Sequence, residues 1–396
     1  MRIVLVVNNF PDEGRLHYGL FNQRTVRELS KHVQLTVIVP MALKPGRKRL
    51  VVEEFEGIPL IRIAAPVIPE MPRLTLQLYY WFVRSPLRTF LSHAQLVHSI
   101  GMEFAGLLAG VLVKRQRYYH ITQFINDINC LKGSNIETYP FLNVLKSNLK
   151  GIICNSKALE LKARQLFPHV KQLKTIYRGT DLSLFRPDGP KPIGLPEKSS
   201  VNFIYLGGIP FYKDRIYGRN TKGGLTLMEA WKSAEDELRR NNSTLIFGGP
   251  EADGQIVRSW REGLKFPDQV LLTGTINPMD VPHYLRGADV ILIPSMEEGC
   301  PNLLFEAFAS GRAVFGSDIG PLAEIIENGE NGLILKAGDV KIWKEAIVSF
   351  SNKESLSLLK TMGAASRRKA EMLFDIRISA KQLVDFYQDV LFSERF

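Results

Sequence analysis

The stretch from residue 286 to residue 335 reads RGADVILIPSMEEGCPNLLFEAFASGRAVFGSDIGPLAEIIENGENGLIL. Its β-branched run, 289–294, is typical of a strand buried on both faces of a parallel sheet. A helix is expected from Pro301-Asn302 to Gly311, since proline favours the first helical turn and glycine the position past the end. A second strand is expected at 313–316. This order predicts an α/β fold whose loop lies at the carboxyl ends of the strands, where open α/β sheets bind ligands.

Two glutamates flank the start of this helix. Glu298 lies in the loop, and Glu306 follows eight positions later in the second turn. A helix amino terminus offers free N–H groups and a positive dipole end to a phosphate. Carboxylates repel a phosphate, so both are expected to accept hydrogen bonds from sugar or ribose hydroxyls. For an isolated pair at this spacing, the alternative is a solvated loop carboxylate and an ordinary helix glutamate.

The residues around the two glutamates resemble the signature of retaining glycosyltransferase family 4, which has the GT-B fold. The resemblance implies two doubly wound Rossmann-like domains facing across a cleft, with a C-terminal helix that returns to the first domain. It also implies a nucleoside diphosphate sugar as donor. The matching positions are Glu298, Gly299, Cys300, Pro301, Asn302, Leu304, Glu306, Ala307, Gly311, Val314, Ser317, Asp318, Gly320, Glu324, Asn331 and Gly332.

The resemblance assigns further residues to the donor side. Lys222 matches a family lysine that neutralises the donor diphosphate, but Gly208 stands where the family has an arginine. The loop between Gly208 and Lys222 is basic, and we expect its Arg219 or Lys213 to replace that arginine. The alternative is that this loop is solvated and its cations have no role in binding. The other donor-binding candidates are Glu306, Gly299, Cys300, Asn302, Leu303 and Leu304 around the helix start, and Gly274 and Thr275 near the nucleotide base.

The candidate catalytic residues are Glu298, Lys222 and Asp127. Asp127 matches the family's HG-x-D pattern, whereas Phe124 stands in place of its histidine, and a helix cap is an equal alternative for Asp127. Gly14 lies in the loop that, in members of the family, approaches the diphosphate or the acceptor. The leaving diphosphate needs charge stabilisation. No Asp-x-Asp metal motif is present, so the sequence predicts no metal and no cofactor besides the sugar donor.

The length of 396 residues exceeds the size at which a single hydrophobic core stops growing, which predicts two domains. We expect an N-terminal domain at 1–187, a proline- and glycine-rich linker at 188–200 and a C-terminal nucleotide-sugar-binding domain at 201–374. Residues 375–396 are expected to form the helix that packs back on the N-terminal domain.

The net charge of +11 is unevenly distributed. Residues 1–200 hold 28 Lys and Arg against 14 Asp and Glu, a charge of +14, while residues 201–396 hold 23 against 26, or −3. A basic first half suggests an anionic partner. The segment 71–93 is rich in apolar residues and carries three arginines, so it could lie in an anionic membrane interface. The alternative is a helix packed on the first domain's own sheet and divided by Pro86.

These observations predict a cytoplasmic enzyme, with peripheral attachment to the inner face of the membrane as an extension. The first apolar run is too short for a signal peptide, and three dispersed cysteines support neither disulfides nor zinc. The expected reaction is retaining, metal-independent sugar transfer to a glycan or lipid-linked acceptor in cell-surface polysaccharide or glycolipid synthesis. An epimerase, a phosphorylase and a non-catalytic sugar-nucleotide-binding protein are the alternatives. Nucleic acid is not expected as a partner.

Overall fold

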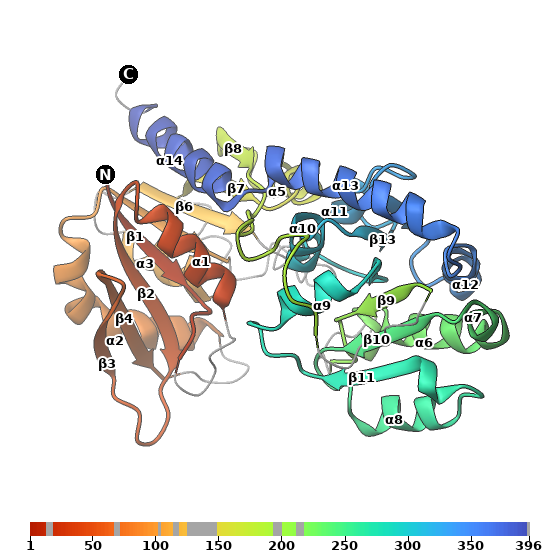
Figure 1. Ribbon diagram of the computed structural model, residues 1–396. Coiled ribbons are helices and arrows are strands. Elements are labelled where there is room, and N and C mark those ends of the chain that lie inside the picture. The colour runs from red at the N-terminus through yellow and green to blue at the C-terminus, as the bar shows by residue number, and fades with distance from the viewer. Residues whose placement is uncertain are drawn as a thin grey trace. The chain divides into compact units, whose positions relative to one another are not determined.

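The computed structural model describes residues 1–12, 19–66, 72–101, 104–113, 119–124, 149–192, 200–210 and 218–393. The chain divides into two compact units, each with its own sheet and helices (Figure 1). Unit 1 consists of Met1–Gly179 and Ile376–Phe396, and unit 2 of Thr180–Asp375. The predicted α/β class, with two doubly wound sheets and a C-terminal helix that returns to the first unit, is confirmed.

Unit 1 is built on a sheet of order β3-β4-β2-β1-β5-β6-β7-β8, in which β3 alone is antiparallel to its neighbour among the described strands. Its central strands β1, β5 and β6 are buried on both faces, which is typical of parallel sheets. The elements are β1 (Arg2–Val7), α1 (Leu20–Leu29), β2 (Gln34–Ala42), β3 (Leu50–Phe55), β4 (Ile58–Ala65), α2 (Pro72–Leu91), β5 (Leu96–Ile100), α3 (Phe104–Val113), β6 (Tyr119–Phe124), β7 (Leu149–Cys154), α5 (Lys157–Leu166), β8 (Gln172–Thr175) and α14 (Ile376–Phe392).

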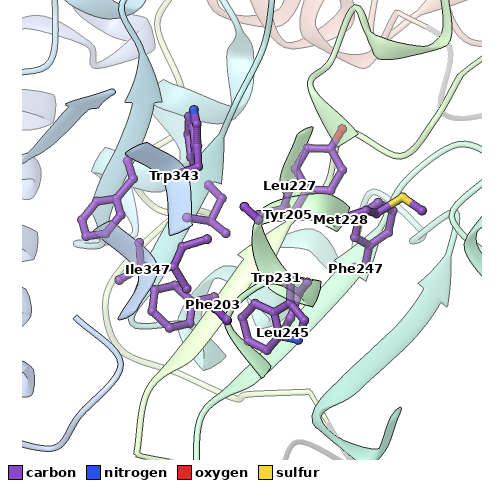
Figure 2. Packing of buried hydrophobic residues seen from close by; sticks show 14 of the residues in the cluster. Phe203, Tyr205, Leu227, Met228, Trp231, Leu245, Phe247, Trp343 and Ile347 are labelled. Atoms are coloured by element: carbon purple, nitrogen blue, oxygen red, sulfur yellow. The ribbon is translucent and has the colours of Figure 1, made fainter. Parts of the chain in front are cut away.

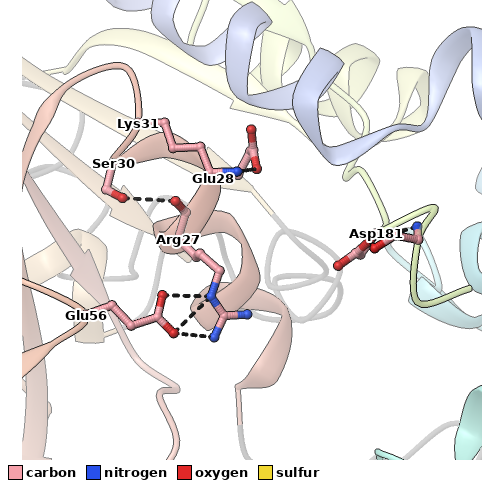
Figure 3. Close-up of polar contacts among 7 residues, drawn as sticks. Arg27, Glu28, Ser30, Lys31, Glu56 and Asp181 are labelled. Carbon is pink, nitrogen blue, oxygen red and sulfur yellow. Dashed lines mark hydrogen bonds and ion pairs between the residues drawn. The ribbon is translucent and has the colours of Figure 1, made fainter.

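The antiparallel hairpin of β3 and β4 turns at Glu56 and Gly57, which both have positive φ, +51° and +81°. The Glu56 carboxylate accepts hydrogen bonds from the Arg27 guanidinium on α1, with Nε–Oε2 at 2.8 Å (Figure 3). This hydrogen bond lowers the pKa of Glu56, and the charge of Arg27 lowers it further. The turn is thereby tied to the helix that covers the neighbouring strands.

The C-terminal helix α14 is part of the unit 1 core. Leu383, Phe386, Tyr387 and Val390 repeat at helical spacing and are all buried against the strands β1 and β5 and the helix α1. The Tyr387 hydroxyl lies 2.7 Å from Nδ1 of the buried His98 on β5. The expectation that the last helix packs on the first domain is realised by this contact.

Helix α2 packs on the unit 1 sheet through Val83, Leu87 and Leu91, which recur every fourth residue and are buried. The alternative of a helix packed on this sheet also expected a division at Pro86, but the helix continues through that residue. A proline cannot donate to the carbonyl four residues earlier, here that of Phe82. Arg49 compensates, because its Nη2 donates to the Phe82 carbonyl while its guanidinium lies 4.6 Å from the centre of the Phe82 ring.

Unit 2 has a parallel sheet of order β11-β10-β9-β12-β13-β14. Its main core cluster lies on one face of the sheet, where alternate strand residues such as Phe203, Leu245 and Phe315 pack with helix residues, and Trp231 is edge-on to Phe203 at 6.1 Å (Figure 2). The elements are β9 (Asn202–Tyr205), η3 (Gly218–Asn220), α6 (Gly224–Lys232), α7 (Glu235–Asn241), β10 (Thr244–Gly248), α8 (Gln255–Glu262), η4 (Pro267–Gln269), β11 (Val270–Gly274), α9 (Val281–Gly287), β12 (Val290–Ile293), α10 (Asn302–Ala309), β13 (Ala313–Ser317), α11 (Gly320–Ala323), β14 (Gly332–Leu335), α12 (Val340–Ser349) and α13 (Ser355–Leu373).

The chain passes between the units at Gly179–Thr180 and at Asp375–Ile376, whereas composition placed the first boundary at 187. Residues 180–187 belong structurally with unit 2, because Phe185 is fully buried and Arg367 on α13 donates to its carbonyl oxygen at 3.0 Å. Of the expected linker, residues 193–199 lie outside the described part of the chain. In the described residues, no helix combines the length and apolar character that spanning a bilayer requires.

Candidate functional site

The candidate site of unit 2 lies where its strand order changes direction. β9 is flanked by β10 on one side and by β12 on the other, so the chain leaves β9 and β12 in opposite directions along the sheet. The loops that follow these two strands emerge together at the carboxyl edge. Ligands of open α/β sheets bind at such a switch point. The loop after β12 carries Glu298, and the segment after β9 carries Lys222.

Lys222 and Glu298 form an ion pair at this point. Lys222 Nζ lies 2.6 Å from Glu298 Oε1, and Ser295 Oγ donates to the same oxygen at 3.0 Å. The carboxylate side chain is 10% exposed and the lysine side chain 28% exposed, so the pair is largely shielded but reachable from solvent. The Met296 N–H donates to the Thr221 carbonyl at 2.9 Å, which holds the two loops together.

Gly223 makes this close approach of the two loops feasible. It has φ of +73°, and a Cβ atom there would lie 1.8 Å from the Pro294 carbonyl oxygen. Asn220 secures the start of α6, because its Oδ1 accepts from the Leu225 N–H at 3.0 Å. The Tyr205 hydroxyl lies 3.1 Å from the Lys222 carbonyl oxygen. The backbone that presents the Lys222 ammonium is therefore fixed from three directions.

Gly208 occupies the position at which the resemblance places an arginine. It has φ of +59°, and a Cβ atom would lie 2.0 Å from the Pro250 carbonyl oxygen. No side chain fits this backbone, so the positive charge must come from elsewhere. Arg219 is half-buried in η3, three residues before Lys222. It is the candidate for this positive charge that lies within the described residues. Lys213 lies outside the described residues.

Helix α10 presents a polar face beside a buried one. Leu304, like Phe305 and Phe308, is buried, and the two phenylalanines pack on Phe374. Asn302, Leu303 and Glu306, at helical spacings of three and four, are partly exposed. Gly299 and Cys300, just before the helix, are buried.

The last residue of β11, Gly274, and the next residue, Thr275, lie at the same carboxyl edge. Gly274 has φ of +61°, and a Cβ atom would lie 3.0 Å from the Asp253 carboxylate. The Gly249 N–H donates to the Gly274 carbonyl at 2.8 Å, and Thr275 is exposed. Asp253 was not singled out by the sequence, because an acidic residue two positions before a helix is common.

The acceptor side is less completely described. Gly14 and Asp127 lie outside the described residues, so their roles stay predictions. Phe124 is fully buried in the unit 1 core and its ring centre lies 5.5 Å from that of Phe167, so it is a packing residue. A cavity of about 20 Å³ beside Gln123 and Arg178 has room for about one water molecule and not for a sugar.

Ser295 and Tyr205 are the residues that sequence reasoning missed. Ser295 lies two residues after the buried strand β12, which is a signal that could have identified it. Tyr205 reads as an ordinary core residue, and only its hydroxyl contacts with Gly208 and Lys222 show its role. In the described part of the chain, no three His, Cys, Asp or Glu side chains are grouped closely enough to hold a metal ion.

Comparisons with known proteins show similarity to glycosyltransferases. Residues 211–353 match the family described as glycosyl transferases group 1. The UDP-Gal:alpha-D-GlcNAc-diphosphoundecaprenol alpha-1,3-galactosyltransferase of Escherichia coli is 24% identical over 262 residues, which is 64% of this chain and 64% of that protein. The putative teichuronic acid biosynthesis glycosyltransferase TuaC of Bacillus subtilis is 23% identical over 377 residues, 89% of this chain and 90% of that protein.

The fold is also similar to that of a solved structure. Anabaena HepE in complex with UDP and glucose superimposes with a TM-score of 0.72 at 15% identity, over 98% of this chain and 100% of HepE. The family match covers the site loops from residue 211 to β14, where the signature residues stand. The chain is therefore similar to the glycosyl transferases group 1 over residues 211–353, and its two-domain α/β fold is similar to that of HepE.

Proposed function

We propose that the protein transfers a sugar from a nucleoside diphosphate sugar to a glycan or lipid-linked acceptor, with retention of configuration and without a metal ion. The pathway class is cell-surface polysaccharide or glycolipid synthesis. The observation that carries the proposal is the Lys222–Glu298 pair at the switch point of unit 2. The names of TuaC and of the undecaprenol-linked galactosyltransferase support the acceptor class, and HepE supports UDP as the carrier.

The proposed chemistry gives the two partners different tasks. The bond to the leaving diphosphate breaks in the transition state, and negative charge develops on the phosphate oxygens. Lys222 donates to those oxygens and Arg219 adds a second positive charge. Glu298, relieved of the lysine, accepts a hydrogen bond from a donor-sugar hydroxyl. Ser295 keeps the carboxylate in place during this exchange, because it donates to the oxygen that Lys222 shares.

Glu306 is proposed to hold the ribose hydroxyls from the exposed face of α10, while the first N–H groups of that helix face the diphosphate. Gly274 and Thr275 line the base side. Asp127 and Gly14 complete the proposal on the acceptor side. Retention rests on the family resemblance, and metal independence rests on the lysine and arginine that replace a cation.

A panel of UDP-, GDP- and ADP-sugars tests the donor site. A ligand that binds only the folded state raises the melting temperature, so a shift with one nucleotide class identifies the carrier. Glu306→Gln should abolish that shift, whereas Glu345→Gln, an exposed helical glutamate on α12, should leave it unchanged. If Glu306→Gln binds donor as the wild type does, the assignment of the ribose contact is wrong.

Product analysis tests the reaction. Incubation with donor and a lipid-linked acceptor should yield a glycoside whose anomeric proton signal matches the donor configuration. Chelation with EDTA should leave the rate unchanged. An inverted product, or a rate restored only by a divalent cation, would contradict the mechanism, while turnover of the donor without acceptor would favour an epimerase or a phosphorylase.

A further inference from the structure

We propose that one surface of unit 1 binds an anionic lipid bilayer. The surface, called here the basic face, consists of the loop 43–49 and the outward side of helix α2. Its partner chemistry is a sheet of phosphate headgroups over an apolar interior. The proposal adds a partner to the proposed function without depending on it, because vesicle binding is measured without donor or acceptor.

The loop 43–49 reads LKPGRKR and follows β2 at the carboxyl edge of the unit 1 sheet. Lys44, Lys48 and Arg49 are exposed, and Arg47 is half-buried with its Nη1 donating to the Ala42 carbonyl at 3.2 Å. The loop contains neither Asp nor Glu. Four cations without a counter-charge of their own produce a local positive potential that attracts anionic surfaces.

Helix α2 supplies the apolar part of the basic face. Its inward residues are buried on the sheet, and its outward stripe is exposed at Leu74, Gln77, Trp81, Ser85 and Arg88, spaced by three or four. Trp81 is 61% exposed, although burial would favour so large a ring. The helix also contains no acidic residue, from Pro72 to Leu91.

The loop and the helix are joined where they meet. Arg49 lies 4.6 Å from the centre of the Phe82 ring and donates to the Phe82 carbonyl. Phe82 directly follows Trp81 in the helix, so the end of the basic loop is held beside the exposed tryptophan. The charge and the apolar stripe therefore form one continuous face.

This composition favours a bilayer over a nucleic acid. Tryptophan settles at the depth of lipid headgroups, and leucines beside it enter the apolar boundary below. Leu43 and Leu74 are 39% and 36% exposed and add nothing to base stacking. Each Lys or Arg near an anionic leaflet adds about 1 kcal/mol of attraction. Sequence reasoning that considered 71–93 alone missed the loop.

Vesicle co-sedimentation tests the proposal with the full chain. We expect binding to phosphatidylcholine vesicles that contain phosphatidylglycerol, weak binding to vesicles of phosphatidylcholine alone, and release by added salt. The triple variant Lys44→Gln, Lys48→Gln, Arg88→Gln should bind about a hundredfold more weakly. The matched control Lys353→Gln, Lys360→Gln, Arg368→Gln removes the same charge from exposed positions of unit 2 and should bind as the wild type does.

Trp81 gives a second readout. Its emission should shift to the blue when anionic vesicles are added, and Trp81→Phe should lose that shift. Equal binding to both kinds of vesicle, equal losses in the two triple variants, or no vesicle binding would each overturn the proposal. Binding of the basic face to a DNA oligonucleotide but not to anionic vesicles would also overturn it, in favour of nucleic acid. Neither result changes the donor test.

Discussion

The ammonium of Lys222 lies 2.6 Å from a carboxylate oxygen of Glu298, and these residues stand 76 positions apart in the chain. Both were expected in the site for separate reasons: Lys222 to bind the phosphate and Glu298 to bind a sugar hydroxyl. Their contact means that the positive charge of Lys222 already has a negative partner within the protein. In the proposed function, a donor that brings a diphosphate to Lys222 takes the place of this carboxylate, and Glu298 is then free to accept from a sugar hydroxyl.

Removing the charge of Lys222 should affect turnover far more than stability. Lys222→Met is expected to lower kcat by about 10²–10³-fold, since it removes stabilisation of the leaving diphosphate. The free energy of unfolding should fall by only about 1 kcal/mol, because an ion pair with one partly exposed partner contributes little. Initial rates and urea unfolding measure the two effects.

The exposed pair of Lys265 and Asp236 is the matched control, with 2.8 Å between its charged atoms. Lys265→Met should leave kcat unchanged. If the double variant Lys222→Met, Glu298→Gln has a kcat that is lower than that of the wild type by the full product of the two single effects, the residues act independently. Coupling between the two substitutions is the expected result, because each partner fixes the other.

Gly208→Ala should destabilise unit 2 by at least about 3 kcal/mol, because it adds backbone strain to a steric clash. The Cβ atom would lie 2.0 Å from the Pro250 carbonyl oxygen at a φ of +59°. Gly218→Ala is the control, with φ of +52° and no atom within 4 Å of its Cβ. It should cost about 1 kcal/mol, the cost of the left-handed conformation alone. If urea unfolding shows an equal loss of stability for the two variants, the backbone at Pro250 moves to make room for the added methyl group.

The contact between Arg49 and the Phe82 carbonyl should be worth about 1 kcal/mol only while Pro86 is present. Pro86→Ala restores a backbone N–H that donates to the same carbonyl. Arg49→Gln should therefore lower the free energy of unfolding in the wild type and change it much less in the Pro86→Ala background. Additive effects in this double-mutant cycle would mean that stacking on Phe82 is the main role of Arg49.

Local patterns predicted the elements that obey them. The strand, loop and helix around Glu298 were expected at 289–311, and β12 and α10 occupy 290–293 and 302–309. The hairpin of β3 and β4 was not predicted, because its turn uses Glu56 at positive φ and depends on Arg27, 29 residues earlier. Pro86 suggested a break, but α2 continues through it, and Arg49 contacts the carbonyl of Phe82 that Pro86 cannot reach.

The site was predictable in its residues but not in its contacts. Family resemblance pointed to Lys222 and Glu298, yet no pattern in a single sequence reports that two loops meet. Gly208 stands where the family has an arginine. A side chain there would meet the nearby Pro250 carbonyl, and composition cannot show such a contact. Long-range backbone contacts of this kind could not be predicted from the sequence.

Acid should destabilise unit 1 through its two buried histidines. Burial lowers the pKa of His98 and His120 from 6.5 to about 3, and the charge of His120 adds a smaller effect on His98. Below pH 6.5 the histidines of the unfolded chain bind protons, whereas those of the folded chain stay neutral down to about pH 3. The free energy of unfolding is therefore highest above pH 6.5 and falls as the pH drops toward 3, by about 2 kcal/mol per histidine at pH 5. His98→Asn, which keeps an amide beside Tyr387, should halve this fall, whereas the exposed His32→Asn should not change it. Hydrogen exchange of β5 and β6 at about pH 7.5 and about pH 5 measures the difference, and an unchanged slope in His98→Asn would mean that other groups set the acid response.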